Sequence, residues 1–83
     1  MSRTLAVLVE NRPGVLTRIS GLISRRGFNI ESIAAGYTED KDMTRITIVV
    51  KENDAPRVEQ LVEQLAKLVD VIRIVDLTEM DYL

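Results

Sequence analysis

The stretch that decides the fold is LAVLVENRPGVL, residues 5–16. Its first half is a continuous apolar run that is too short for an isolated helix, and its second half opens with a turn containing proline and glycine. We therefore expect a strand over Arg3–Glu10, followed by a turn and the start of a helix. Successive side chains of a strand point to opposite faces. Both faces are apolar here, which indicates a central strand with helices on one face and another chain on the other.

A helix is expected after the turn. Its apolar residues recur at helical spacing and collect on one face of the helix. They are Val15, Leu16, Ile19, Leu22 and Ile23. Gly27 supplies the left-handed residue that commonly ends a helix. The first helix is therefore predicted at about residues 14–26.

The rest of the chain predicts a hairpin, a second helix and a last strand. Residues 29–37 and 43–51 are rich in β-branched residues and are joined by a short polar turn. Asp54 can cap a second helix with a proline in its first turn, and a β-rich stretch, Val69–Leu77, follows it. The order β-α-β-β-α-β predicts an α+β, ferredoxin-like sandwich, with two helices on one face of a four-stranded antiparallel sheet.

The composition narrows the range of functions. The chain contains no cysteine and no histidine, which excludes thiolate metal sites and removes the commonest metal ligand and general base. Eleven basic and thirteen acidic residues are interspersed to a net charge of −2, so neither nucleic acid nor an anionic membrane is an expected partner. The sequence has no signal-peptide pattern and no apolar run of transmembrane length. We expect a non-catalytic, cytoplasmic protein that holds no metal and no cofactor.

The loop before the first helix is the first candidate site. A helix start leaves backbone N–H groups unpaired, and these favour a carboxylate. Gly14 would let a ligand approach the backbone, and Asn11 can both donate and accept hydrogen bonds, which together suit a zwitterion. The alternative is that both residues only shape the turn and cap the helix. The residues alone leave both interpretations open.

Asn29, followed by Ile30, is the second candidate because it opens the second strand. The β-α-β-β-α-β order conventionally puts the first and third strands in the middle, so the second strand should lie at an edge, where strands tend to pair. If two copies pair through this edge, each Asn29 would approach the other copy's loop and make a composite pocket. Alone, Asn29 is an ordinary turn residue. Arg25 and Arg26 could bind phosphate, but a helix C-terminus favours positive charge in any case, so we interpret them as structural.

Several segments resemble a known family. VENRPGVL, residues 9–16, resembles the first turn of ACT domains, which are amino-acid-sensing modules. RGFNIESI (26–33), TRITI (44–48) and QLAKLVDV (64–71) narrow the resemblance to the small regulatory subunit of acetolactate synthase, also called acetohydroxyacid synthase. The resemblance covers roughly residues 3–77, and the segments occur in the same order and spacing.

This resemblance implies an ACT domain that dimerises edge to edge. It further implies that valine, or the related leucine or isoleucine, binds at the dimer interface for feedback control of branched-chain amino-acid synthesis. The effector-binding residues implied by position are Asn11, Gly14, Val15, Leu16, Asn29 and Ile30. The implied partner is a separate catalytic large subunit that carries thiamine diphosphate, magnesium and FAD, none of which this chain would hold.

The resemblance also gives the expected domain bounds, and alternative functions remain. We expect one ACT domain over residues 1–78, with residues 79–83 beginning a connection to an absent or truncated C-terminal region. The main alternative is a free-standing amino-acid-binding ACT protein that regulates a different enzyme. An RNA-recognition module of the same element order would need aromatic residues on its central strands, and LAVLV and TRITIVV have none. A small enzyme would need a converging catalytic constellation, which the sequence does not offer.

Overall fold

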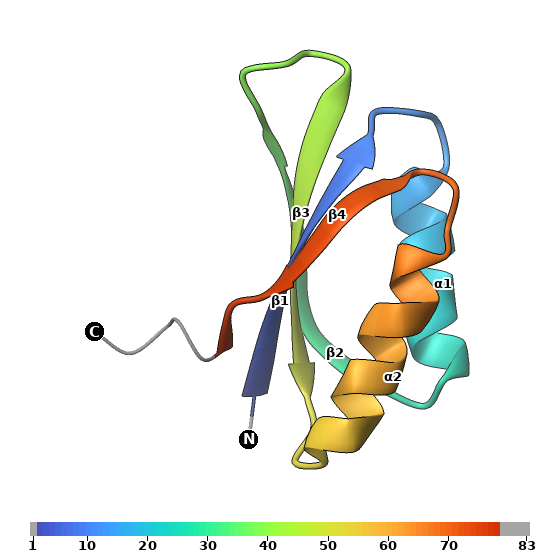
Figure 1. The fold of residues 1–83 in the computed structure, drawn as a ribbon, viewed down its shortest axis with the longest axis vertical. Coiled ribbons are helices and arrows are strands. Elements are labelled where there is room, and N and C mark those ends of the chain that lie inside the picture. The colour runs from blue at the N-terminus through green and yellow to red at the C-terminus, as the bar shows by residue number, and fades with distance from the viewer. Residues whose placement is uncertain (1, 79–83) are drawn as a thin grey trace.

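The computed structural model of the chain describes residues 2–78 (Figure 1). The strands and helices follow one another in the predicted order. They are β1 (Ser2–Glu10), α1 (Val15–Arg25), β2 (Asn29–Tyr37), β3 (Met43–Lys51), α2 (Ala55–Ala66) and β4 (Val71–Asp76). Each predicted element is confirmed, with small differences at its ends. The connection predicted at residues 79–83 lies outside the described residues.

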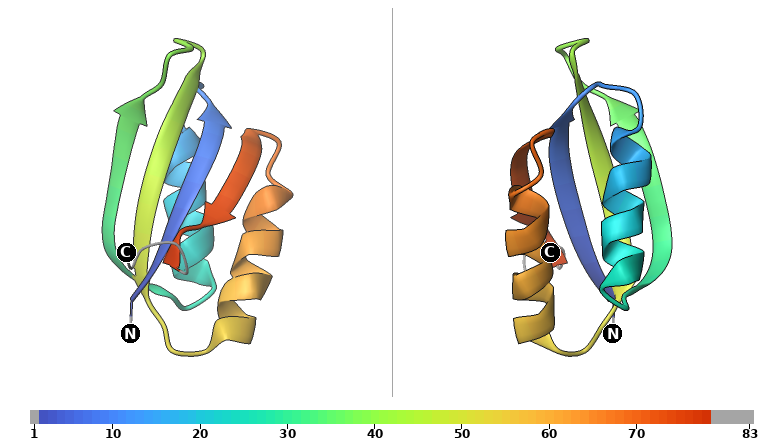
Figure 2. Two further views of the ribbon diagram at one scale, coloured as in Figure 1. Left: turned by 60° about the vertical axis from the view of Figure 1, so that its left-hand side comes forward. Right: turned by 90° about the vertical axis from the view of Figure 1, so that its right-hand side faces the viewer.

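The four strands form one antiparallel sheet in the order β2-β3-β1-β4. Figure 2 shows this order face-on, with β1 and β3 in the middle and β2 and β4 at the two edges. Both helices cover the same face of the sheet (Figure 1), and α2 lies beside β4. The predicted ferredoxin-like sandwich, including the edge position of the second strand, is therefore confirmed.

The hydrophobic core lies between the helices and one face of the sheet. Every second residue of the central strands points into it, as the strand period requires. The buried sheet residues are Leu5, Val7 and Val9 of β1 and Ile46, Ile48 and Val50 of β3. The helices contribute buried aliphatic stripes: Val15, Ile19 and Ile23 from α1, and Val58, Leu61 and Leu65 from α2. Phe28 is the one aromatic residue in this core cluster.

Two glycines determine where α1 begins and ends. Gly14 occupies the N-cap with φ 82°, and Gly27 follows the helix with φ 83°, both in the left-handed region that side chains disfavour. The second helix differs from expectation in one detail. Asp54 is at its N-cap position, but its side chain makes no capping hydrogen bond. The Asp54 backbone carbonyl instead accepts the N–H groups of Arg57 and Val58, at 3.1 and 3.2 Å.

The sheet face away from the helices is partly apolar. Ala6 and Leu8 of β1 point to this face and are half-buried. The register places Leu8 between Arg45 of β3 and Arg73 of β4, so two cations flank it. Among residues 2–78, no helix combines the length and the apolar character needed to cross a membrane.

Candidate ligand-binding site

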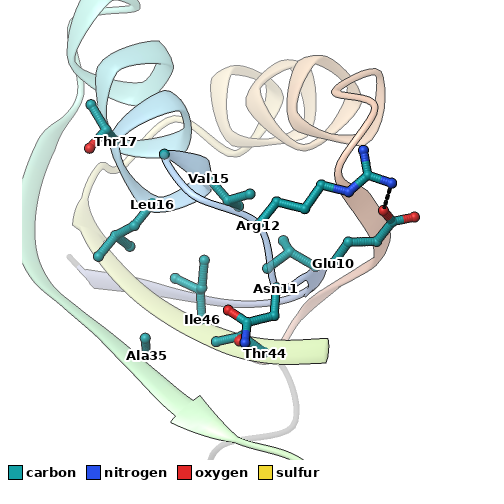
Figure 3. A pocket seen from close by; sticks show the side chains of 11 residues that line it. Glu10, Asn11, Arg12, Val15, Leu16, Thr17, Ala35, Thr44 and Ile46 are labelled. Atoms are coloured by element: carbon teal, nitrogen blue, oxygen red, sulfur yellow. Dashed lines mark ion pairs between the residues drawn. The ribbon is translucent and has the colours of Figure 1, made fainter. Parts of the chain in front are cut away.

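A pocket of about 180 Å³ lies where the loop after β1 meets the start of α1 and the neighbouring strands (Figure 3). The loop residues and the first turn of α1 form one side, and β2 and β3 form the other. Its lining residues are Val9, Glu10, Asn11, Arg12, Gly14, Val15, Leu16, Thr17, Ala35, Thr44 and Ile46. This volume is below the roughly 300–1,000 Å³ of pockets for drug-sized ligands, so the pocket suits a molecule of few heavy atoms.

The first turn of α1 supplies hydrogen-bond donors at this pocket. The N–H of Val15 already donates to the Arg12 carbonyl at 3.3 Å, and the N–H of Arg18 donates to the Gly14 carbonyl at 2.9 Å. Leu16 and Thr17 lie between these two residues, and their N–H groups have no intrahelical acceptor. No side chain caps the helix. Together with the positive end of the helix dipole, these two donors favour a carboxylate.

Gly14 keeps this end of the helix open. A Cβ atom built there would lie 3.1 Å from Nη1 of Arg18, and the positive φ of residue 14 would strain any side chain. The backbone of the first turn is therefore reachable from the pocket because residue 14 is a glycine. Turn formation and ligand access both require Gly14, so the two interpretations of this residue are compatible.

Asn11 is held at the pocket by the turn between β2 and β3. Its N–H donates to the Asp42 carbonyl at 2.8 Å, and its Nδ2 donates to the Lys41 carbonyl at 3.4 Å. Figure 3 shows the amide of Asn11 beside Thr44, at the polar rim of the pocket. The Asn11 side chain is exposed, so its amide can reach a bound polar group.

The rest of the pocket lining is largely aliphatic and comes from β1, the first turn of α1, β2 and β3. Val9, Val15 and Ile46 are buried there, while Leu16 is 42% exposed and Ala35 is exposed on the edge strand β2. A small ligand could thus place a charged end at the helix terminus and an apolar side chain against this lining. This combination of polar and apolar lining would suit a small amphiphilic acid.

Four of the six predicted site residues come together in this pocket: Asn11, Gly14, Val15 and Leu16. Asn29 and Ile30 are toward the opposite end of β2 from Ala35, about 20 and about 17 Å away at the usual rise per residue. Within one chain they do not reach the pocket. Their predicted role requires a second copy, so it stays a prediction.

Sequence reasoning missed several lining residues. Thr17 follows Leu16 in the first helical turn, and its place there could have been inferred from the unpaired amides. Ala35, Thr44 and Ile46 come from distant parts of the chain and are brought together by the pairing of β2 with β3, in which Ala35 lies opposite Ile46. No local pattern marks them.

Arg26, one of the two arginines interpreted as structural, contacts α2. Nη2 of Arg26 donates to Oε1 of Gln64 at 3.0 Å, and the Arg26 carbonyl accepts Nη2 of Arg57 at 2.8 Å. The Arg57 guanidinium also stacks over the Phe28 ring, 4.5 Å from its centroid. These contacts tie α1 to α2. Within residues 2–78, no group of three or more acidic, histidine or cysteine side chains could hold a metal ion.

Solved structures first define the class of protein. The ACT domain of a GTP pyrophosphokinase from Chlorobium tepidum superposes with a TM-score of 0.78 over 92% of this chain and 96% of that one, at 17% identity, which shows the fold alone. The acetolactate synthase small subunit from Thermotoga maritima superposes with a TM-score of 0.82 at 38% identity, over 92% of this chain and 47% of that one. The molecule is an ACT domain by its fold.

Sequence comparison then gives the family. Residues 5–73 match the AHAS small subunit-like ACT domain, and the chain belongs to this family. The acetolactate synthase small subunit of Mycolicibacterium smegmatis is 59% identical over 78 residues, which are 94% of this chain and 45% of that protein. A probable acetolactate synthase small subunit from Archaeoglobus fulgidus is 56% identical over 79 residues, 95% of this chain and 49% of that protein. The chain spans about half the length of these relatives.

Proposed function

We propose that this domain binds a branched-chain amino acid in the pocket at the start of α1 and thereby regulates acetolactate synthase. The observation that carries the proposal is the pairing, in one small pocket, of a carboxylate-favouring helix terminus with an aliphatic wall. The amides of Leu16 and Thr17 would hold the carboxylate of the ligand, and Val9 and Ile46 would contact its side chain. Membership of the small-subunit family supports acetolactate synthase as the regulated enzyme.

A second copy of the chain would complete the site. We infer that two β2 edges pair antiparallel about a two-fold axis, which is the symmetry of most homodimers. Pairing centred on Ile33 sets Asn29 of one chain opposite Tyr37 of the other, and so brings it toward the partner's Ala35 and pocket. Asn29 and Ile30 would then close the open side of the pocket. The ligand would contact both chains, with Asn29 available for its ammonium group.

Binding across an interface can also explain regulation. A ligand shifts a conformational equilibrium only by the difference in its affinity for the two states. A ligand held between two chains favours the arrangement in which both sides of the pocket meet. A coupling of roughly 1–3 kcal/mol to the catalytic chain would suffice for useful inhibition.

The proposed partner is a separate catalytic large subunit, as the name "small subunit" of the relatives suggests. The resemblance implies that this partner holds thiamine diphosphate, magnesium and FAD and that this domain supplies regulation. Control of a different enzyme by a free-standing domain is the alternative. Co-purification with the thiamine diphosphate-dependent subunit separates these two cases, because only the preferred one predicts a complex.

Calorimetric titration of the dimeric chain with valine, leucine and isoleucine tests the site. We expect at least one of them to bind the wild type, and Gly14→Asp to abolish detectable binding. The new carboxylate would occupy the helix terminus and stand beside Arg18, whose Nη1 is 3.1 Å from the Cβ position. Gln60→Glu, at an exposed position of α2, adds the same charge away from the pocket and serves as the control.

Two outcomes would contradict the proposal. If a folded, dimeric wild type binds none of the three amino acids, a branched-chain amino acid is not the ligand of this domain. Binding by Gly14→Asp as tight as by the Gln60→Glu control would instead show that the ligand lies elsewhere.

A further inference from the structure

An ion pair between a buried carboxylate and a half-exposed arginine, Asp70 and Arg18, lies behind the proposed effector loop. Asp70, in the turn between α2 and β4, is 4% exposed, which makes it the buried charged residue of the described region. Its Oδ2 accepts Nε of Arg18 at 3.0 Å and also accepts Nη2 of the same guanidinium. Such a charge is expensive to bury unless it is paired, so the position of Arg18 is strongly constrained.

Asp70 contacts both ends of the loop that precedes α1. Its backbone carbonyl accepts the N–H of Glu10, the last residue of β1, at 2.9 Å. Its carboxylate holds Arg18, in the first full turn of α1, whose N–H donates to the Gly14 carbonyl at 2.9 Å. One residue from a distant part of the chain therefore fixes where the loop leaves the strand and where it enters the helix.

The other restraints on the loop are mostly local. The N–H of Arg12 donates to the Glu10 carbonyl at 2.9 Å, the Arg12 guanidinium pairs with the Glu10 carboxylate, and the N–H of Val15 donates to the Arg12 carbonyl at 3.3 Å. Asn11 contacts the turn between β2 and β3, and no side chain caps α1.

Arg18 also passes close to the pocket, since its Nη1 lies 3.1 Å from where a Cβ on Gly14 would be. The ion pair draws this guanidinium toward Asp70. It thereby sets the orientation of the first helical turn, whose amides are the proposed carboxylate donors.

We propose that Arg18 and Asp70 are positioning residues for the effector site, and that their ion pair holds the 11–14 loop and the first turn of α1 in the ligand-binding conformation. The proposal rests on the proposed function for its ligand. It predicts that affinity for the ligand depends on the ion pair more than on overall stability, because the pair pre-organises the donors without touching the ligand.

The test compares Asp70→Asn, Arg18→Met and Arg18→Lys with the wild type in the full chain. Asp70→Asn keeps the shape and an acceptor at residue 70 but removes the charge, and Arg18→Lys keeps the charge of residue 18. Val62→Ala is the control, because Val62 is half-buried in α2, a helix that contributes nothing to the pocket, and its loss lowers stability alone. Valine, leucine and isoleucine are the calorimetric probes, and thermal unfolding by circular dichroism confirms that each variant is folded.

We expect Asp70→Asn and Arg18→Met to weaken binding by roughly tenfold, a typical coupling between interacting sites. Arg18→Lys should lose much less affinity than Arg18→Met. Val62→Ala should bind with wild-type affinity, even if its unfolding temperature falls as far as that of Asp70→Asn. Wild-type affinity in a folded Asp70→Asn variant would overturn the proposal. So would an equal loss of affinity in Val62→Ala, because stability alone would then explain it.

Amide hydrogen exchange provides a readout that needs no ligand. We expect Asp70→Asn to accelerate exchange at the Arg18 amide relative to the amides of β3, whereas Val62→Ala should affect both alike. A wild type that binds no branched-chain amino acid would contradict the proposed function, but unchanged relative exchange at Arg18 would contradict the positioning role. The two failures are therefore distinguishable.

Discussion

At the scale of single residues, Gly14 carries the strongest local constraint. Its φ of 82° disfavours every residue with a Cβ, and its missing side chain leaves the guanidinium of Arg18 room. Gly27 has a nearly identical φ of 83°, but a Cβ there would meet only Nη2 of Arg57 at 3.6 Å, an ordinary contact. A comparison of substitutions at the two glycines therefore distinguishes the cost of backbone strain from the cost of local crowding.

We predict that Gly14→Ala destabilises the domain more than Gly27→Ala. Both substitutions carry the left-handed strain of roughly 1–2 kcal/mol. Gly14→Ala adds the 3.1 Å contact with Arg18, which cannot move freely because Asp70 holds it. Urea unfolding of the two variants measures the difference. Equal losses of stability would mean that Arg18 moves aside at little cost.

At the scale of elements, α1 contributes one set of side chains to the hydrophobic core and another to the pocket. Val15, Ile19 and Ile23 point into the core, and Ile23 is fully buried. Leu16 lies beside Val15 in sequence but is 42% exposed and lines the pocket. The same helix therefore both stabilises the core and supplies part of the pocket lining.

These two sets of side chains should respond differently to truncation. We predict that Ile23→Ala costs about 2–5 kcal/mol of unfolding free energy, as is usual for a fully buried aliphatic residue. Leu16→Ala should cost less than about 1 kcal/mol because the side chain is largely exposed, yet it should weaken binding of branched-chain amino acids. Denaturant unfolding and calorimetry measure the two effects. A large stability loss in Leu16→Ala without a loss of affinity would assign Leu16 to packing.

At the scale of the whole molecule, the sheet ends in two edges that differ in their surroundings. β2 is the edge strand next to the pocket through Ala35, and β4 is the opposite edge (Figure 2). Unprotected edges offer unpaired backbone groups to another chain. Because Asn29 lies on β2, pairing through β2 would complete the pocket, whereas pairing through β4 would leave it open.

One charge on each edge distinguishes these arrangements. Ala34 of β2 and Val75 of β4 both face away from the helices, opposite Thr47 and Ala6 respectively, and both are exposed. We predict that Ala34→Asp shifts the proposed dimer toward monomer, because like charges would meet near its two-fold axis. Val75→Asp should leave the dimer intact. Sedimentation velocity measures both, and dissociation of the Val75→Asp variant alone would place the interface at β4.

Much of the fold of this protein can be predicted from its sequence. Alternating apolar residues in the strands and helical spacing in the helices are local patterns, so the βαββαβ order and the central place of the first strand could be predicted. Gly14 and Gly27 mark helix ends because no other residue adopts their φ easily. Asn11 and Gly14 could be nominated as site residues because a helix start has unpaired amides wherever it occurs.

Tertiary structure alone decided the rest. Ala35 and Ile46 lie side by side in the wall of the pocket because of the register between β2 and β3, which no short segment specifies. By its spacing Arg18 lies off the apolar stripe of the first predicted helix, and Asp70 fell within the predicted last strand, Val69–Leu77, whereas the structure places it in the turn before β4. Only the folded chain brings their charges together across 52 positions. Local sequence determines backbone conformation through short-range sterics and hydrogen bonding. The pocket wall and its supporting ion pair depend on contacts between segments far apart in the chain, which exist only once the core has formed.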